Sequence, residues 1–571
     1  MGTEMGTWKT TALVAALAMT QIAHAQTPAA APRSSVGSNP LDALPQVNAP
    51  ARPPSVEVEV KAPQQQLQEL LARHITPSSI QIEGVKSIPF DEVAKRFTSF
   101  VGTDITIGQL VETANGVTAL YKERGYALSF AFVPAQTFEK GVVRVTIVEG
   151  YVSDIKIKGE PGNLEKRIRA IAERIAADRP LRQATFERYI NVLGMIPGAK
   201  IDATVAPPQN TNGATTMELN VTRKRFNVST GIDVNHPGLQ GIFSATENGL
   251  LGLGESITAS ALAPKGRNDS TYYGINAMAP VGSDGFAMKV DASHYYGHPV
   301  DNPGLPSYIE RTVVNDKLAL SAIYPFILSN SKSLLGTATV YATHDEDRLK
   351  NMIVAGNPQL TQRSQIRVAQ LSLDYTGIQT GVTRRVNVQI AKAFDVLGAS
   401  KTAESNIAGL QLQNPVSLTF LRTGATYTQT NDWPFKIGTV VAMTGQFSPD
   451  TLPTSEQISF GAQRFALGYQ PGEVSGDSGW GASFEVNRPL PLEWAYLKSL
   501  TPYASVDMAR IFLHGGTPTP RRLSSVGIGF RISDAKHYNI DLSVARAIGD
   551  APIESSSRSP RVNATFSYQL N

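Results

Sequence analysis

The C-terminal part of the sequence, from residue 225 onward, alternates between apolar and polar residues in short segments. Between 538 and 544, tyrosine, isoleucine, leucine and valine alternate with asparagine, aspartate and serine, and segments 226–234, 286–293 and 562–570 show the same period of two. A period of two is typical of a β-strand, whose successive side chains point to opposite faces. Each of these strands would therefore have one face suited to an apolar environment and one suited to water.

The length of this region favours a membrane barrel over other all-β folds. Residues 225–571 contain no second pattern, and segments of about 10 residues suit tilted membrane strands. Allowing roughly 20 residues for a strand and its connection, the region holds about 16 antiparallel strands, within the range of outer-membrane barrels. A secreted sandwich or solenoid would show the same alternation. The export signal at the N-terminus favours the barrel, with polar faces lining a wet lumen.

The N-terminus has the organisation of a secretory signal peptide, assigned to residues 1–25. Lys9 precedes a short apolar run at 12–19, and Ala23-His-Ala25 provides a small-residue cleavage site. The run is too short to span a bilayer as a helix, and no other run of about 18 apolar residues follows. An exported chain of this kind can enter a membrane only as a closed barrel.

Residues 26–75 are rich in proline, alanine, serine and glutamine. Such a composition cannot bury a core and predicts an extended linker. Within it, segments 40–44 and 64–74 could each form a short helix, and a plug helix for the barrel pore is one possible use of such a segment.

Between linker and barrel, a small α+β unit occurs twice, at 76–150 and 151–224. Thr106 and Gln109 form a capping box at the start of a helix that Gly125 ends in the left-handed conformation. A repeated unit indicates a modular arm, although two unrelated α+β domains would fit the same pattern. The expected strands are 80–85, 127–133, 142–148, 152–158, 200–205 and 216–222, and the expected helices are 91–100, 106–121, 164–177 and 181–195.

Composition and motifs exclude several functions. The sequence has no cysteine, which excludes disulfides, cysteine-ligated metals and thiol nucleophiles, and its net charge of +4 makes no case for nucleic acid. No His-Glu-x-x-His, phosphate-binding Gly-rich loop or credible nucleophile elbow is present. The scattered histidines His294, His298 and His344 are interpreted as polar barrel or loop residues. We therefore predict no enzyme, no catalytic residue, no cofactor and no metal site.

Residues 458–485 stand out within the barrel region, because glycine and aromatic residues follow one another with polar residues between them. Such a stretch interrupts the short alternating strands. We expect it to form a loop that lies inside or across the barrel.

The chain resembles the outer-membrane transporters of two-partner secretion, the haemolysin-activator and filamentous-haemagglutinin-transporter type. This family belongs to a superfamily that joins periplasmic POTRA domains to a barrel of about 16 strands. The segment that opens at Gly125 is similar to the first POTRA signature, 195–198 to the second, and 458–485 to the long loop that folds back into the barrel in relatives. The residues that carry the resemblance are Gly125, Tyr126, Pro134, Gln136, Gly150, Pro197 and Gly198 in the arm, and Gly468, Tyr469 and Asp507 in the barrel.

Two departures from the family pattern concern this loop. Relatives carry an arginine at the loop tip where this chain has Leu467, and an aromatic residue where it has Ser505. Asp507 shares strand parity with Tyr503 and should face the lumen. A partly enclosed carboxylate needs a partner, so we expect Arg464 to supply the cation through a bidentate contact. The alternative is that lumen water solvates Asp507.

The resemblance implies an outer-membrane pore with its POTRA domains in the periplasm. Its partners would be one large secreted exoprotein recognised while unfolded, the outer-membrane lipid, and the barrel-assembly machinery that inserts it. A barrel-assembly factor would share both parts but typically has more POTRA units, and a porin-like channel would lack the arm.

Overall fold

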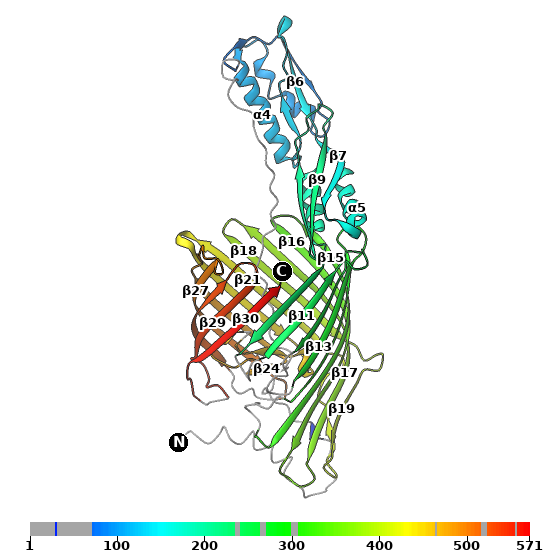
Figure 1. Cartoon of the computed structure of the whole chain (residues 1–571), viewed down its shortest axis with the longest axis vertical. Coiled ribbons are helices and arrows are strands. Elements are labelled where there is room, and N and C mark those ends of the chain that lie inside the picture. Colours follow the sequence, from blue (N-terminus) through cyan, green and yellow to red (C-terminus); the bar gives the residue numbers. More distant parts are fainter. Residues whose placement is uncertain are drawn as a thin grey trace.

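The computed structural model describes residues 29–30, 71–234, 240–262, 270–298, 306–462, 465–515, 522–553 and 557–570. The described residues form an arm, residues 71–224, that stands on one end of a closed barrel (Figure 1). The signal peptide and both short helices expected at 40–44 and 64–74 lie outside the described residues or at their edge. No helix in the described part of the chain is long and apolar enough to cross a bilayer.

The first unit of the arm is a three-stranded sheet in the order β3-β6-β5, packed against helix α4. The capping box is confirmed: Gln109 N–H donates to the Thr106 hydroxyl, and the Gln109 side chain accepts from Thr106 N–H. The helix expected at 91–100 is shorter, because Thr98 turns its hydroxyl back to the carbonyl of Ala94 at 3.1 Å and a 3-10 turn follows. The elements are β2 (His74–Ile75), β3 (Ser79–Glu83), α3 (Phe90–Ala94), β4 (Ile105–Thr106), α4 (Ile107–Glu123), β5 (Phe130–Phe132) and β6 (Val142–Val148).

The second unit repeats this arrangement. Its sheet has the order β7-β9-β8, with β7 parallel to β9 as β3 is parallel to β6. Ile168, Ile171 and Ile175 lie three or four residues apart on one face of the first helix of this unit, and all three are fully buried against the sheet. The elements are β7 (Tyr151–Gly159), α5 (Glu165–Ala176), α6 (Gln183–Gly194), β8 (Ala199–Val205) and β9 (Ala214–Arg223).

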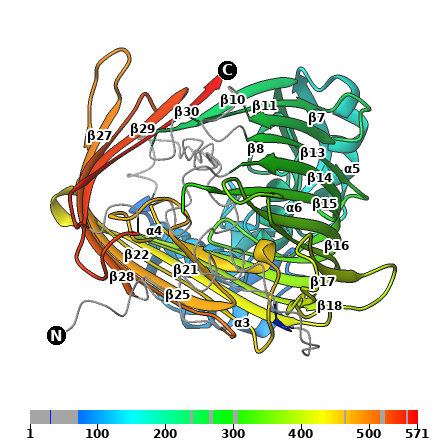
Figure 2. The ribbon, with the colours of Figure 1, turned by 90° about the horizontal axis from the view of Figure 1, so that it is seen from below.

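The barrel closes where β10 pairs with β30, and it has 16 strands within the described residues when β18 with β19, and β25 with β26, count as one strand each (Figure 2). The expected fold class is therefore confirmed. The strands are β10 (Phe226–Asp233), β11 (Gln240–Asn248), β12 (Ser256–Leu262), β13 (Thr271–Pro280), β14 (Ala287–Gly297), β15 (Ile309–Leu328), β16 (Lys332–Asn351), β17 (Gln359–Gln379), β18 (Val382–Ala393), β19 (Ser400–Ser405), β21 (Leu421–Trp433), β22 (Ile437–Phe447), β25 (Ser478–Asn487), β26 (Leu490–Pro491), β27 (Ser499–Phe512), β28 (Arg522–Ser533), β29 (Tyr538–Ala547) and β30 (Arg561–Leu570).

The two faces of the barrel wall differ as the alternation predicts. Val290, Leu320 and Val340 occupy one row across β14, β15 and β16, and all three are exposed on the outer surface. Serine, threonine, asparagine and charged residues occupy many of the alternate, inward positions. The outer face is therefore suited to lipid, and the inner face to water or a polar chain.

The arm is fastened to the barrel through the turn between β13 and β14. Arg188 of α6 donates to the Asp284 carboxylate at 3.2 Å and to the carbonyl of Pro325 at 3.1 Å. The hydroxyls of Tyr189 and Tyr324 also donate to Asp284, at 3.1 and 2.6 Å. Burial alone would raise the pKa of Asp284, but the bonds from Tyr324 and Arg188 outweigh it and lower this pKa below its usual range. The contact fixes the orientation of the second unit on the barrel.

Replacing Asp284 with alanine is expected to loosen this contact, because Arg188 and two tyrosines lose a shared acceptor. Pulsed electron paramagnetic resonance between spin labels on α5 and on β14 should give a broader distance distribution. Since the folded-state pKa is depressed, wild type should keep the narrow distribution at neutral pH and lose it progressively as the pH falls below about 4. Asp202→Ala, which removes the exposed Lys200–Asp202 pair in the same arm, is the control that should change nothing.

Candidate functional site: the loop inside the barrel

Residues 448–477 form a long loop between β22 and β25, at the end of the barrel opposite the arm. Within it, β23 (Ile458–Phe460) pairs antiparallel with β24 (Val474–Gly476), so the loop is a folded hairpin. Phe460, Tyr469 and Val474 are almost completely buried and pack against Ile511 and Leu523 on the inner wall. Apolar side chains on the inner wall would otherwise face water in the lumen, and the loop shields them from it.

The tip of the loop presents backbone N–H groups to Asp507. Phe465 and Ala466 both adopt left-handed backbone conformations, with φ of 59° and 62°. This turn directs the N–H of Leu467 to the Asp507 carboxylate at 3.2 Å, and the Ser525 hydroxyl donates to the other carboxylate oxygen. Left-handed conformations cost free energy in residues other than glycine, so the surrounding contacts must hold the tip in place.

Gly468 and Tyr469 seat the tip against the last barrel strands. A Cβ atom at Gly468 would lie 2.4 Å from the backbone nitrogen of Ala547, so only glycine allows this approach. The Tyr469 hydroxyl donates to the carbonyl of Asp550 at 2.7 Å. The Asn563 amide donates to the carbonyl of Leu467 at 2.9 Å, which adds a contact from β30.

Three of the four predicted loop residues therefore meet at one place: Gly468, Tyr469 and Asp507. Arg464 lies outside the described residues, so its ion pair with Asp507 stays a prediction. The partners that the structure gives Asp507 are backbone N–H groups and a serine hydroxyl, which sequence reasoning missed. The donor to Asp507 is the backbone N–H of Leu467, which every residue type except proline has. The identity of the side chains at the loop tip therefore could not predict this contact.

A second attachment joins the loop to the opposite wall. Glu456 accepts from the Tyr341 hydroxyl at 2.9 Å and pairs with Arg422 at 3.1 Å, and the side chains of Arg422 and Glu456 are 14% and 4% exposed. Ser455 donates to Asp345 at 2.9 Å. A buried carboxylate is stable only with such partners. The loop is thus held by β16 and β21 on one side and by β27 to β30 on the other, across the lumen.

Asp477 closes the base of the loop. It is fully buried, and its carboxylate accepts from the backbone N–H groups of Leu452 and His514, each at 2.8 Å. Leu452 lies at the start of the loop and His514 follows β27. One carboxylate therefore ties together three chain segments at the barrel mouth.

A charged cluster lines the lumen between the loop and the arm. Arg531 donates to Glu485 at 2.8 and 2.6 Å and to Asp541 at 2.9 Å, and its guanidinium lies 4.2 Å from the centre of the Tyr503 ring. These residues come from β25, β27, β28 and β29. Parity alone predicts that each faces inward, whereas their mutual contacts depend on strand register, which the sequence does not reveal.

Two of the POTRA motif residues, Gly125 and Gly150, lie at the joint between the two arm units. The carbonyl of Gly125 accepts from Gln183 N–H at 2.7 Å, and that of Gly150 accepts from Leu181 N–H at 2.9 Å. The Gln136 side chain bonds both the N–H and the carbonyl of Arg144, each at 2.8 Å. Tyr126 packs edge-on against Tyr121, Pro134 follows β5, and Pro197 and Gly198 form the turn between α6 and β8. These positions shape the joint and the turns.

Glu149, which precedes Gly150, has a role that the motif comparison missed. It accepts from the backbone N–H groups of Lys86 and Ser87 at 2.9 and 2.7 Å, and from the Tyr121 hydroxyl at 2.9 Å. Burial raises the pKa of Tyr121 above its ordinary value, and the bond to Glu149 raises it further. The carboxylate therefore joins the loop after β3 to helix α4.

Replacing Glu149 with alanine is expected to destabilise the first unit by about 2–4 kcal/mol, because several donors lose one charged acceptor. Hydrogen exchange of the α4 amides in the full chain should accelerate accordingly. Glu149→Gln, which keeps an acceptor oxygen, should cost less than the alanine variant. Glu112→Ala, on the exposed face of the same helix, is the control; an equal effect there would argue against this role.

Comparisons with known proteins agree with this architecture. Residues 75–150 match the model of the POTRA domain of ShlB type, and residues 331–532 match that of the haemolysin secretion/activation protein ShlB/FhaC/HecB. The heme/hemopexin transporter protein HuxB of Haemophilus influenzae is 20% identical over 483 residues, covering 80% of each chain.

Solved structures share the fold. CdiB from Escherichia coli superposes with a TM-score of 0.65 at 17% identity, covering 91% of this chain and 94% of CdiB. BamA from Haemophilus ducreyi lacking POTRA domains 1–3 superposes with a TM-score of 0.52 at 14% identity, and the match covers 87% of this chain and 100% of that one. With both family models matched on the arm and on the barrel, the chain belongs to the haemolysin secretion/activation family, the outer-membrane pores of two-partner secretion.

Proposed function

We propose that this pore exports one large exoprotein, which its two arm units capture unfolded in the periplasm. The observation that carries the proposal is the loop 448–477, which occupies the lumen and is held by one small hydrophobic cluster and by a few polar contacts on each wall. A loop held in this way blocks the passage at rest and can be displaced by a chain that offers replacement contacts.

Capture would use the exposed strand edges of the arm. In the two sheets, β5 and β8 are edge strands. The Thr118 hydroxyl already bonds the N–H and the carbonyl of Ala131 in β5, so of these two edges β8 is the one that a further strand can join. An extended segment of the exoprotein can pair there, with main-chain hydrogen bonds providing affinity and side-chain pockets providing selectivity. The second unit would present this edge in a fixed relation to the barrel mouth, because the Arg188–Asp284 contact fastens it to the barrel.

Translocation would then follow the polar inner face. No phosphate-binding loop for ATP is present in the sequence, so direction would come from folding of the exoprotein outside the cell. The Arg531 cluster is already paired internally. It therefore offers a passing chain a polar surface without a strong unpaired charge that would hold it.

The test is comparative mass spectrometry of culture supernatant and outer-membrane fraction, with and without the gene. We expect one large protein to disappear from the supernatant while the membrane profile stays the same. A broad loss of other barrels would instead indicate a barrel-assembly factor. This is the second candidate function, because the chain shares its fold with BamA. An unchanged supernatant would contradict the secretion proposal.

A further inference from the structure

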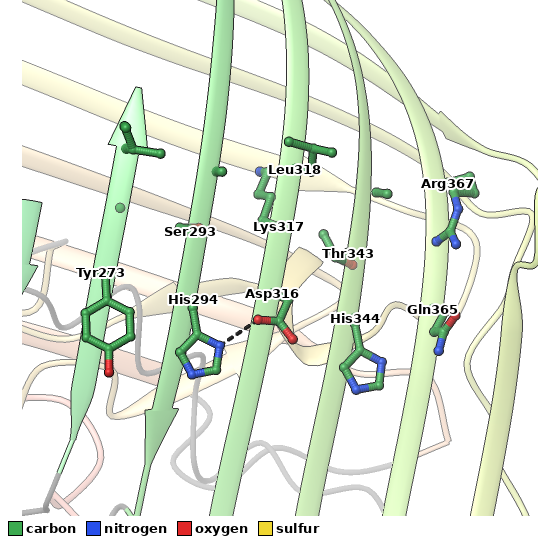
Figure 3. A pocket seen from close by; sticks show the side chains of 14 residues that line it. Tyr273, Ser293, His294, Asp316, Lys317, Leu318, Thr343, His344, Gln365 and Arg367 are labelled. Carbon is green, nitrogen blue, oxygen red and sulfur yellow. Dashed lines mark hydrogen bonds and ion pairs between the residues drawn. The ribbon is translucent and has the colours of Figure 1, made fainter. Parts of the chain in front are cut away.

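The outer surface of the barrel has a polar notch in its extracellular half. Register places Tyr273, His294, Asp316, His344 and Gln365 in one row across β13 to β17, with Arg367 two residues further along β17 (Figure 3). All lie on the same face as the lipid-facing row Val290, Leu320 and Val340, because they share strand parity with it. They line a shallow cavity of about 570 Å³.

The groups in this notch are arranged by their neighbours. The His294 ring stacks on Tyr273 with centroids 5.7 Å apart and bonds Asp316 through Nδ1 at 2.6 Å. Arg367 donates to the carbonyls of Leu397 and Ile366. A guanidinium has five N–H donors, so these two bonds leave donors for a ligand. Acceptors and donors thus lie side by side on a surface that faces lipid.

An apolar groove continues from the notch toward the arm end. Its floor is made by small side chains, Ala322, Ala338 and Ala369, and its sides by Leu320, Leu371 and Ile390, enclosing about 440 Å³. The notch and the groove are contiguous, because Leu318 and Leu320 are successive outward residues of β15. Together they match a molecule with a polar head and an acyl chain.

The position of the notch is near the outer membrane boundary. The aromatic residues Tyr324 and Phe326 mark the opposite boundary near the arm, and their ring centroids lie 5.3 Å apart. Asp316 precedes Tyr324 on β15, and a rise of about 3.3 Å per residue at a tilt of about 40° separates them by roughly 20 Å along the barrel axis. The apolar band of such barrels is about 25 Å tall. The notch therefore lies about 5 Å inside the outer boundary of this band, within reach of the head groups of the outer leaflet.

We propose that the notch and groove bind one phosphorylated glycolipid of the outer leaflet. Arg367 and His344 would donate to a phosphate, Asp316 and Gln365 would accept from sugar hydroxyls, and Tyr273 offers an aromatic face to the sugar. One acyl chain would lie over the alanines. The bound lipid would cover polar groups that otherwise face the membrane, on the wall formed by the long strands β15, β16 and β17.

The test uses the full-length protein in detergent with bis-phosphorylated lipid A as the probe, read by native mass spectrometry. Wild type should retain one lipid A. The double variant Arg367→Gln with His344→Gln should lower retention at least about tenfold, because charge-assisted hydrogen bonds to phosphate are lost. Ala338→Leu, which fills the groove and leaves the notch intact, should lower it as well.

The matched control is Arg384→Gln, an outward-facing arginine of β18 at the arm end, which should retain lipid A like wild type. The heat-dependent gel shift of a folded barrel verifies that each variant is folded. The proposal is overturned if wild type retains no lipid A, if the double variant retains as much as wild type, or if dephosphorylated lipid A or phosphatidylethanolamine is retained equally well.

Discussion

Replacing Asp507 with alanine is expected to free the tip of the inward loop and to open the resting pore. Asp507 is 4% exposed and accepts from Leu467 N–H and from Ser525. Without it these donors stay buried without a charged acceptor, and the strained turn at Phe465 and Ala466 loses its restraint. We expect docking of the tip to weaken by about 2–4 kcal/mol, or roughly 30- to 1000-fold.

Two measurements check this prediction. Hydrogen exchange of the loop amides should accelerate by a comparable factor, and the ion conductance of the protein in a planar bilayer should rise, because the loop blocks the passage for less of the time. Asp374→Ala is the matched control, because Asp374 also faces the lumen but is exposed and accepts a hydrogen bond from Asn387 on the neighbouring strand, far from the loop tip. Unchanged protection of the loop in Asp507→Ala would contradict the role assigned to this carboxylate.

A third variant addresses the cation expected from the sequence. If Arg464 pairs with Asp507, Arg464→Gln should weaken docking about as much as Asp507→Ala, and exchanging the two residues should restore part of it. If the backbone donors alone hold the carboxylate, Arg464→Gln should leave exchange at the tip unchanged. The two results separate an ion pair from a purely backbone contact.

Much of this architecture follows from local patterns. Alternation at 538–544 and 562–570 depends only on side chains pointing to opposite faces of a strand, so it predicts both the strand and its two environments. The start of the helix that Thr106 caps is likewise determined by four neighbouring residues. Such signals are contained in a few neighbouring residues, which is why the amino-acid sequence alone is enough to reveal them.

The site required information that is distributed over the whole barrel. Arg531 meets Glu485 and Asp541 only because of the register of β25, β28 and β29, and a shift of one residue would turn each side chain to the other face. The contact between Glu456 and Arg422 joins the loop to β21, a strand that is distant from Glu456 in sequence. No local pattern encodes either pairing, so parity predicted where residues face but not what they touch.

The buried pair of Arg422 and Glu456 is expected to give the second large effect. Arg422→Ala would leave Glu456 as a charge 4% exposed, with the Tyr341 hydroxyl as its remaining side-chain partner among the described residues. Removing one member of a buried pair typically costs about 3–5 kcal/mol, because the other charge stays desolvated. We expect the near limb of the loop, 448–460, to lose most of its protection from hydrogen exchange.

The double variant Arg422→Met with Glu456→Gln distinguishes an uncompensated charge from lost packing. Glutamine still offers an acceptor to Tyr341 but carries no charge, so the double variant should be more stable than Arg422→Ala despite having two changes. Lys289→Ala, which breaks the more exposed lumen pair with Asp291, should cost about 1 kcal/mol or less. If the double variant is as unstable as the single one, the loop is held by the shape of Arg422 and not by its charge.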